Sequence, residues 1–129
     1  DKIQPIWADH YFKTIANAKM GLNLSRGQAI KYYSSDRITQ IVGNGLVCLI
    51  DEKTKYRDYF DNSEMVFYKN ENDLSEKILK ISRDEKLRKS IGRKGKNKYM
   101  KFFNSTKVAE FIINKTLDIE SKKKYYWHN

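Results

Sequence analysis

The stretch that decides the fold is SDRITQIVGNGLVCLI, residues 35–50. Ile38, Ile41 and Val42 recur at helical spacing, so its first half is predicted to be a short amphipathic helix. Residues 46–50 form a continuous apolar run of strand length, which is typical of a parallel strand buried on both faces. The GNG sequence between them ends the helix, because glycine tolerates left-handed backbone. A helix followed at once by a buried strand is the unit from which parallel α/β sheets are built.

The same alternation of helix and strand patterns continues on both sides of this unit. Apolar runs predict further strands at residues 20–24 and 65–68, and helical patterns lie at 8–18, from an N-cap at Asp73, from about Asp84, and at 108–117. Strands separated by helices indicate a parallel sheet with right-handed crossovers. Three strands are few for a doubly wound domain. We therefore expect an α/β fold: a partial Rossmann-like sheet of about three strands with flanking helices over residues 1–120, and a basic, aromatic tail over 121–129.

Composition places the chain among globular proteins. Of its 129 residues, 40% are hydrophobic and 33% are charged, and no apolar run is long enough to cross a membrane. The first residue is Asp1, so we expect a piece of a longer chain whose other strands precede it. Cys48 is a lone cysteine in an apolar run, which favours a buried, inert thiol and a cytoplasmic location. His10 and His128 lack ligand spacing, so no metal is expected.

Ligands of open parallel sheets bind outside the carboxyl ends of the strands, and two segments meet that condition. The loop after residues 20–24 contains Arg26 and Tyr32, and a helix starts at Ser35, Asp36 and Arg37. Free N–H groups and the dipole at a helix start suit a phosphate. Arg37, with Arg26 from the loop, can bond a pyrophosphate, and Tyr32 can stack on a base or line a sugar pocket. Alternatively, Arg37 and Asp36 are a solvated surface pair, with Asp36 favouring the helix dipole.

Several segments together resemble one known family. They are GLNLSR at residues 21–26, SDRITQIVGNGLV at 35–47 and EMVFY at 64–68, followed by the later helices with their junction at 103–105. In this order and spacing they resemble the C-terminal domain of CgeB-like (spore-maturation type) glycosyltransferases, a branch of the family-1-like GT-B group. The resemblance covers roughly residues 5–118.

The resemblance implies a function and a set of roles. Members have two Rossmann-like domains, and the C-terminal one binds a nucleotide-sugar donor without a metal or other cofactor. Arg37 matches the arginine that contacts the donor diphosphate. Gln40 stands where the family commonly has a glutamate that bonds the ribose; an amide still donates and accepts at a diol, but more weakly. The implied protein is a bacterial hexosyltransferase-like enzyme whose N-terminal domain supplies any base, so this part alone is expected to be inactive. The helix at 108–117 either crosses to that domain or joins the core.

A competing interpretation rests on charge. The net charge is +10, and residues 83–129 carry 14 basic and 5 acidic side chains, against 12 and 11 in residues 1–82. Basic patches with aromatic residues bind nucleic acid or anionic membranes, so a binding module without catalytic activity is the alternative function. The lysines of residues 83–101, however, lie opposite the apolar stripe, as in an ordinary solvated helix. We expect an anionic membrane surface to be the better second partner and do not expect nucleic acid.

Overall fold

The chain folds around a small parallel sheet, and the computed structural model describes residues 4–25, 27–33, 35–121 and 123–128. Three strands, β1 (Met20–Asn23), β2 (Val47–Asp51) and β3 (Val66–Tyr68), pair in the order β1-β2-β3. Both pairings are parallel, with Met20 opposite Val47 and Leu49 opposite Val66. The predicted α/β fold with a partial Rossmann-like sheet is therefore confirmed.

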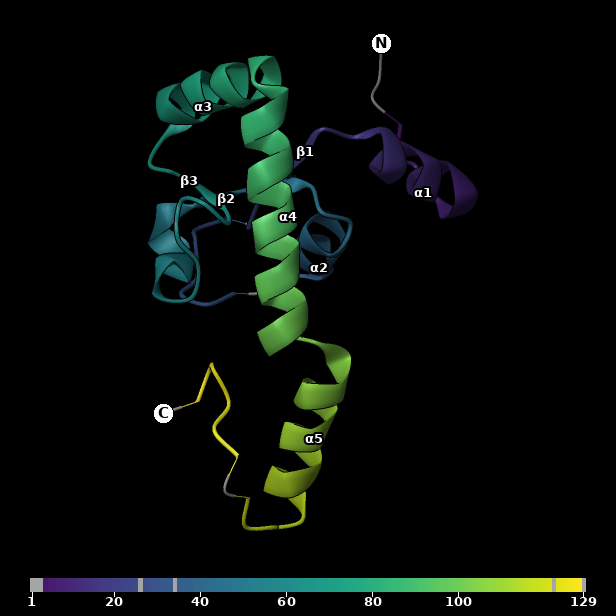
Figure 1. Cartoon of the computed structure of the whole chain (residues 1–129), viewed down its shortest axis with the longest axis vertical. Coiled ribbons are helices and arrows are strands. Elements are labelled where there is room, and N and C mark those ends of the chain that lie inside the picture. The colour runs from purple at the N-terminus through teal and green to yellow at the C-terminus, as the bar shows by residue number, and fades with distance from the viewer. Residues whose placement is uncertain (1–3, 26, 34, 122, 129) are drawn as a thin grey trace.

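Helices cover both faces of this sheet (Figure 1). They are α2 (Asp36–Gly43), α3 (Glu71–Arg83) and α4 (Glu85–Phe102). On one face of β2, Cys48 and Ile50 share an apolar cluster with residues of α2. On the other face, Val47 and Leu49 pack with Ile81 of α3. α4 contributes to both clusters, so it ties the two faces together.

The start of α3 differs from the sequence prediction. Asn70 is the N-cap, and its side-chain oxygen accepts a hydrogen bond from the backbone nitrogen of Asp73 at 3.0 Å. Asp73, predicted to be the cap, lies in the first turn and accepts from the nitrogen of Lys69 at 2.9 Å. Asparagine and aspartate cap helices about equally well, so local sequence did not separate the two candidates. The start predicted for α4, near Asp84, is confirmed, and Asp84 is its N-cap.

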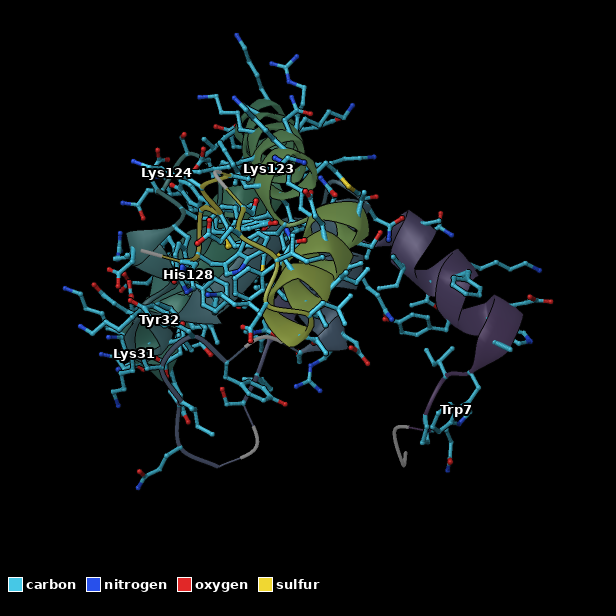
Figure 2. All side chains as sticks on the ribbon, turned by 90° about the horizontal axis from the view of Figure 1, so that it is seen from below. Trp7, Lys31, Tyr32, Lys123, Lys124 and His128 are labelled. Carbon is cyan, nitrogen blue, oxygen red and sulfur yellow. The ribbon has the colours of Figure 1, made fainter. Side chains whose placement is uncertain are left out.

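Two helices add no buried residue to the core: α1 (Ala8–Asn17) and α5 (Ser105–Thr116). α1 projects away from the sheet (Figure 1), and Trp7, just before it, is 76% exposed and lies apart from the body of the chain (Figure 2). On α5 and just beyond it, the apolar stripe is exposed as well; its members are Val108, Ile112, Ile113 and Leu117. Both helices therefore carry apolar surface that this core does not use.

The C-terminal segment, residues 123–128, folds back against the end of α4. The ring of Tyr126 stacks on Phe102 with centroids 4.5 Å apart, and its hydroxyl donates to the carbonyl of Tyr59 at 3.3 Å. Trp127 lies 5.6 Å from the ring of Phe103. The aromatic residues of the tail thus extend the aromatic cluster at the end of α4.

The connection between β2 and β3 consists of two short 3-10 helices, η1 (Glu52–Thr54) and η2 (Tyr56–Asp58). η2 forms a single helical turn, and both Tyr56 and Phe60 are buried. Within the described part of the chain, no helix has the length and apolar character needed to cross a membrane.

Candidate functional site

The carboxyl ends of the strands form the sheet edge at which ligands of open parallel sheets bind. A hollow of about 590 Å³ opens along this edge, and residues that follow all three strands line it. Leu24 follows β1, Lys53 follows β2, and Lys69 follows β3 just before α3. Sequence reasoning did not single out the two lysines, although their places one or two residues after a strand could have indicated them. They bring positive charge to this edge, and Asp51 and Glu71, which line the same hollow, bring as much negative charge.

The start of α2 borders the same edge, and the residue that precedes it is turned away from the helix. Ser35 makes no side-chain cap, and its hydroxyl instead donates to Oδ1 of Asn23 at 2.8 Å. At α3, α4 and α5, by contrast, the N-cap side chain accepts a hydrogen bond from the first turn. The side chain of Ser35 thus supplies no acceptor to the first turn of α2, although its backbone carbonyl accepts from the nitrogen of Ile38 at 3.0 Å. With the helix dipole, the N–H groups at this helix start present partial positive charge.

Arg37 points from the first turn of α2 to the carboxyl end of β1. One terminal nitrogen of its guanidinium donates to the backbone carbonyl of Leu24, which also lines the edge hollow. A guanidinium carries five N–H donors, so this one bond does not exhaust it. The side chain is exposed. The charge predicted to contact a pyrophosphate therefore lies at the sheet edge and in reach of solvent.

Asp36, the other charged residue of this helix start, is exposed in the first turn. A carboxylate there complements the positive end of the helix dipole. Its carboxylate is negatively charged like a phosphate, so Asp36 can bind an anion only through its backbone N–H group.

Tyr32 is held on the segment that follows β2. Its backbone nitrogen donates to the carbonyl of Thr54 at 2.8 Å, and its hydroxyl donates to Oδ2 of Asp58 at 2.5 Å. The bond to Asp58 raises the pKa of Tyr32 to about 12. The ring lies 5.1 Å from that of Tyr59 and is 39% exposed. Its hydroxyl is thus already engaged, and only the exposed part of the ring can meet a ligand.

The two remaining predicted site residues are Gln40 and Arg26. Gln40 is exposed on α2, one turn after Arg37, and its side-chain oxygen accepts a hydrogen bond from the hydroxyl of Tyr11 on α1. Arg26 lies outside the described residues. The structure therefore gathers Ser35, Asp36 and Arg37 at one helix start, with Gln40 on the following turn.

Asn23, which ends β1, is a site residue that sequence reasoning did not single out. It is 2% exposed, and its side-chain nitrogen is buried without a hydrogen-bond partner among the described residues. In the sequence it is one polar residue inside a strand-like run, and such a run gives no signal of what faces it. Only the packing of α2 on β1 brings it against Ser35.

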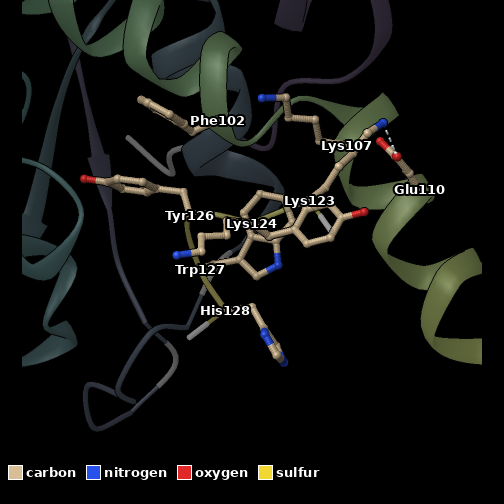
Figure 3. A pocket seen from close by; sticks show the side chains of 9 residues that line it. Phe102, Lys107, Glu110, Lys123, Lys124, Tyr126, Trp127 and His128 are labelled. Carbon is tan, nitrogen blue, oxygen red and sulfur yellow. Dashed lines mark hydrogen bonds and ion pairs between the residues drawn. The ribbon is translucent and has the colours of Figure 1, made fainter. Parts of the chain in front are cut away.

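A second hollow, of about 990 Å³, lies between α5 and the C-terminal segment and shares no residue with the edge hollow (Figure 3). Aromatic rings of the tail line it together with Lys107, Lys123 and Lys124. Lys123 forms an ion pair with Glu110. The ring of Trp127 itself packs against the rings of Phe103 and Phe111. This hollow is basic, but its aromatic residues serve mainly to hold the tail in place.

Across residues 4–25, 27–33, 35–121 and 123–128, no group of three or more His, Cys, Asp or Glu side chains is placed to hold a metal ion. Cys48 is fully buried, and burial raises its pKa to about 12. The prediction of a buried thiol is confirmed, and its inertness stays a prediction.

The fold is thus a parallel α/β sheet with the start of α2 and the guanidinium of Arg37 at its carboxyl edge. The sequence matches the model of the glycosyl transferase-like family over residues 1–114. The chain therefore belongs to the glycosyl transferase-like family. Neither the curated proteins nor the solved structures give a significant match to it.

Proposed function

We propose that this domain binds the nucleoside diphosphate of a sugar-nucleotide donor and that the whole enzyme transfers the sugar to an acceptor. The observation that carries the proposal is the place of Arg37, whose guanidinium reaches the carboxyl end of β1 beside the uncapped start of α2. Glycosyl transfer releases a nucleoside diphosphate, so an enzyme must stabilise the charge that builds on it. Positive side chains and a helix start supply that stabilisation without a metal ion.

The residues of the edge divide into roles under this proposal. Arg37 and the N–H groups that follow Ser35 bind the diphosphate, with Arg26 as a further cation from the loop. Gln40 contacts the ribose, and the exposed ring of Tyr32 borders the base or the sugar. Asp36 contributes its backbone N–H group. The edge hollow beside Leu24 provides room for the part of the donor that lies beyond the phosphates.

We further propose the GT-B arrangement, with an N-terminal domain in the same chain that faces this one and supplies any general base. The exposed stripe of α5 supports it, because Ile112, Ile113 and Leu117 are each more than half exposed here. Apolar surface of this extent usually marks a contact with another domain or protein. The same proposal includes the CgeB-like branch, hexosyl transfer in a bacterial cytoplasm, and inactivity of this domain alone.

Donor binding is tested with the full-length protein by calorimetry against a panel of sugar nucleotides, with UDP- and GDP-sugars first. We expect one nucleotide class to bind with a dissociation constant in the micromolar to millimolar range that is usual for enzyme substrates, roughly 1 μM to 1 mM. The free nucleoside should bind much more weakly, since the site is built around the diphosphate. If no sugar nucleotide binds, the proposal is wrong.

The second candidate function is attachment to an anionic membrane surface, which suits a transferase whose acceptor is linked to a lipid. The basic side chains predicted to lie opposite the apolar stripe of α4 are all exposed; they are Lys86, Lys89, Arg93 and Lys96. Near an anionic surface each lysine or arginine contributes about 1 kcal/mol, so several on one face suffice for weak attachment. Nucleic acid is not proposed, because the ring of Trp127 in the tail already packs against the rings of Phe103 and Tyr125.

Vesicle sedimentation tests this second candidate. The full-length protein should sediment with phosphatidylglycerol vesicles and stay in solution with phosphatidylcholine vesicles. Replacing Lys86, Lys89 and Lys96 together by glutamine should weaken attachment by about 100-fold, since about 1 kcal/mol is lost for each charge. The matched control removes three exposed lysines away from α4, at Lys13, Lys31 and Lys55. Equal losses in both triple variants would mean that net charge, and not this face, attracts the membrane.

A further inference from the structure

The side-chain amide of Asn23 is the unusual polar group of the sheet edge. Asn23 is 2% exposed, and its Nδ2 has no hydrogen-bond partner within the described part of the chain. Burying a donor without a partner costs free energy, so native proteins leave few such groups, and those that remain call for an explanation. A group of this kind at the edge where ligands bind points to a partner that the protein itself does not supply.

Packing of α2 on β1 orients this amide. Gly21, two residues before Asn23, faces the same helix, because a Cβ atom there would lie 2.4 Å from Cγ1 of Ile41. Residues two apart on a strand point to the same face, so Asn23 also faces α2, at its N-terminal end. There Ser35 donates to Oδ1 of Asn23 at 2.8 Å. The Ser35 hydroxyl thus binds the oxygen of the Asn23 amide, and the amide nitrogen is left for a ligand.

The groups around this amide define the chemistry of the partner. Nδ2 of Asn23 and the first N–H groups of α2 are all donors, and the guanidinium of Arg37 adds a positive charge beside Leu24. A partner for this set has to be an acceptor with negative charge. An unprotonated phosphate oxygen meets both conditions, whereas a sugar hydroxyl meets only the first.

We propose that Asn23 is a donor-binding residue that donates its side-chain amide to a phosphate oxygen of the donor diphosphate. The inference rests on the proposed function and extends it to a residue deep in the sheet. Protein atoms cover the amide in this structure, so the oxygen reaches it when the side chains over the helix start shift. In the same step, the guanidinium of Arg37 releases the backbone carbonyl of Leu24 and donates to the anion instead.

Calorimetry of the full-length protein with inorganic pyrophosphate and with nucleoside diphosphates tests this role. Asn23→Ala should weaken both ligands by about tenfold or more, as expected for a lost hydrogen bond to a charged group. Asn23→Asp, which replaces the donor by a carboxylate of the same shape, should weaken them by about 100-fold, because two anions then face each other. Asn104→Ala is the matched control: it removes an asparagine whose oxygen caps α5 and which does not line the edge hollow, and it should leave the affinity unchanged.

A measurement on the unchanged protein covers the case in which a variant does not fold. With asparagine side chains labelled by ¹⁵N, the amide proton resonances of Asn23 should move downfield when pyrophosphate is added, because a new hydrogen bond forms. Unchanged resonances at saturating pyrophosphate would overturn the inference. Tighter binding by Asn23→Asp would overturn it as well, since the ligand atom would then be a donor.

The outcomes also separate this inference from the proposed function. If the wild-type protein binds diphosphates and Arg37→Ala weakens them, but Asn23→Ala does not, then Asn23 has no such role and the proposed function stands. If the wild-type protein binds neither pyrophosphate nor any nucleoside diphosphate, both proposals are wrong.

Discussion

Arg37→Ala should weaken binding of the sugar nucleotide to the full-length protein by about 10- to 100-fold. The reason is the loss of charge-assisted hydrogen bonds to the diphosphate, which contribute about 1.5–3 kcal/mol. Arg37→Lys keeps the charge but loses the planar fork, so an intermediate loss is expected. Calorimetry with the nucleotide class identified for the wild type measures both effects.

The control for this prediction is Arg93→Ala, which removes the same charge from an exposed position on α4. It should bind the nucleotide as the wild type does. Circular dichroism should show unchanged helix content in both variants, because neither side chain is buried. Equal affinity of the Arg37→Ala and wild-type proteins would refute the role of this residue at the diphosphate.

Gly92→Ala should destabilise the domain by about 2 kcal/mol. α4 passes so close to the connection before β2 that a Cβ atom at Gly92 would lie 2.0 Å from the backbone oxygen of Gly45. Backbone on both sides of the contact has little freedom to move, so a cost near 3 kcal/mol is expected for the added methyl group. The gain of about 1 kcal/mol in helix propensity offsets only part of it. Urea unfolding followed by circular dichroism measures the difference.

Gly43→Ala is the matched control, because it makes the same chemical change at a helical glycine that has room. The nearest atom to a Cβ atom there is the end of the flexible Met100 side chain at 3.6 Å, which is an ordinary contact. We expect no loss of stability and a gain of up to about 1 kcal/mol. If Gly92→Ala is as stable as this control, α4 does not pack against the Gly45 backbone as closely as the structure has it.

The elements of the fold were largely predictable because their signals are local. The apolar run at residues 46–50 became β2, and the helical spacing of Ile38, Ile41 and Val42 became the buried side of α2. Alternation of such segments leads to a parallel sheet with few alternatives. The start of α3 was the exception, since two good capping residues lie three positions apart and the end of β3 decides between them.

The candidate site was predictable only in part. The helix start at Ser35 and the direction of Arg37 follow from the order of strand, loop and helix, and the structure places both at the sheet edge. Tyr32 was expected to face a ligand, yet its hydroxyl is bonded to Asp58, a residue 26 positions away. The roles assigned to these residues at a donor remain predictions.

The sequence by itself determined the alternation of helices and strands, the parallel sheet and the family, because periodicity and motif order depend on neighbours along the chain. Tertiary structure alone decided which polar groups meet. Ser35 reaches Asn23 across 12 positions, and Tyr126 reaches the carbonyl of Tyr59 across 67. Such contacts depend on the distance between elements that pack on one another, and the spacing of residues along the chain does not indicate that distance.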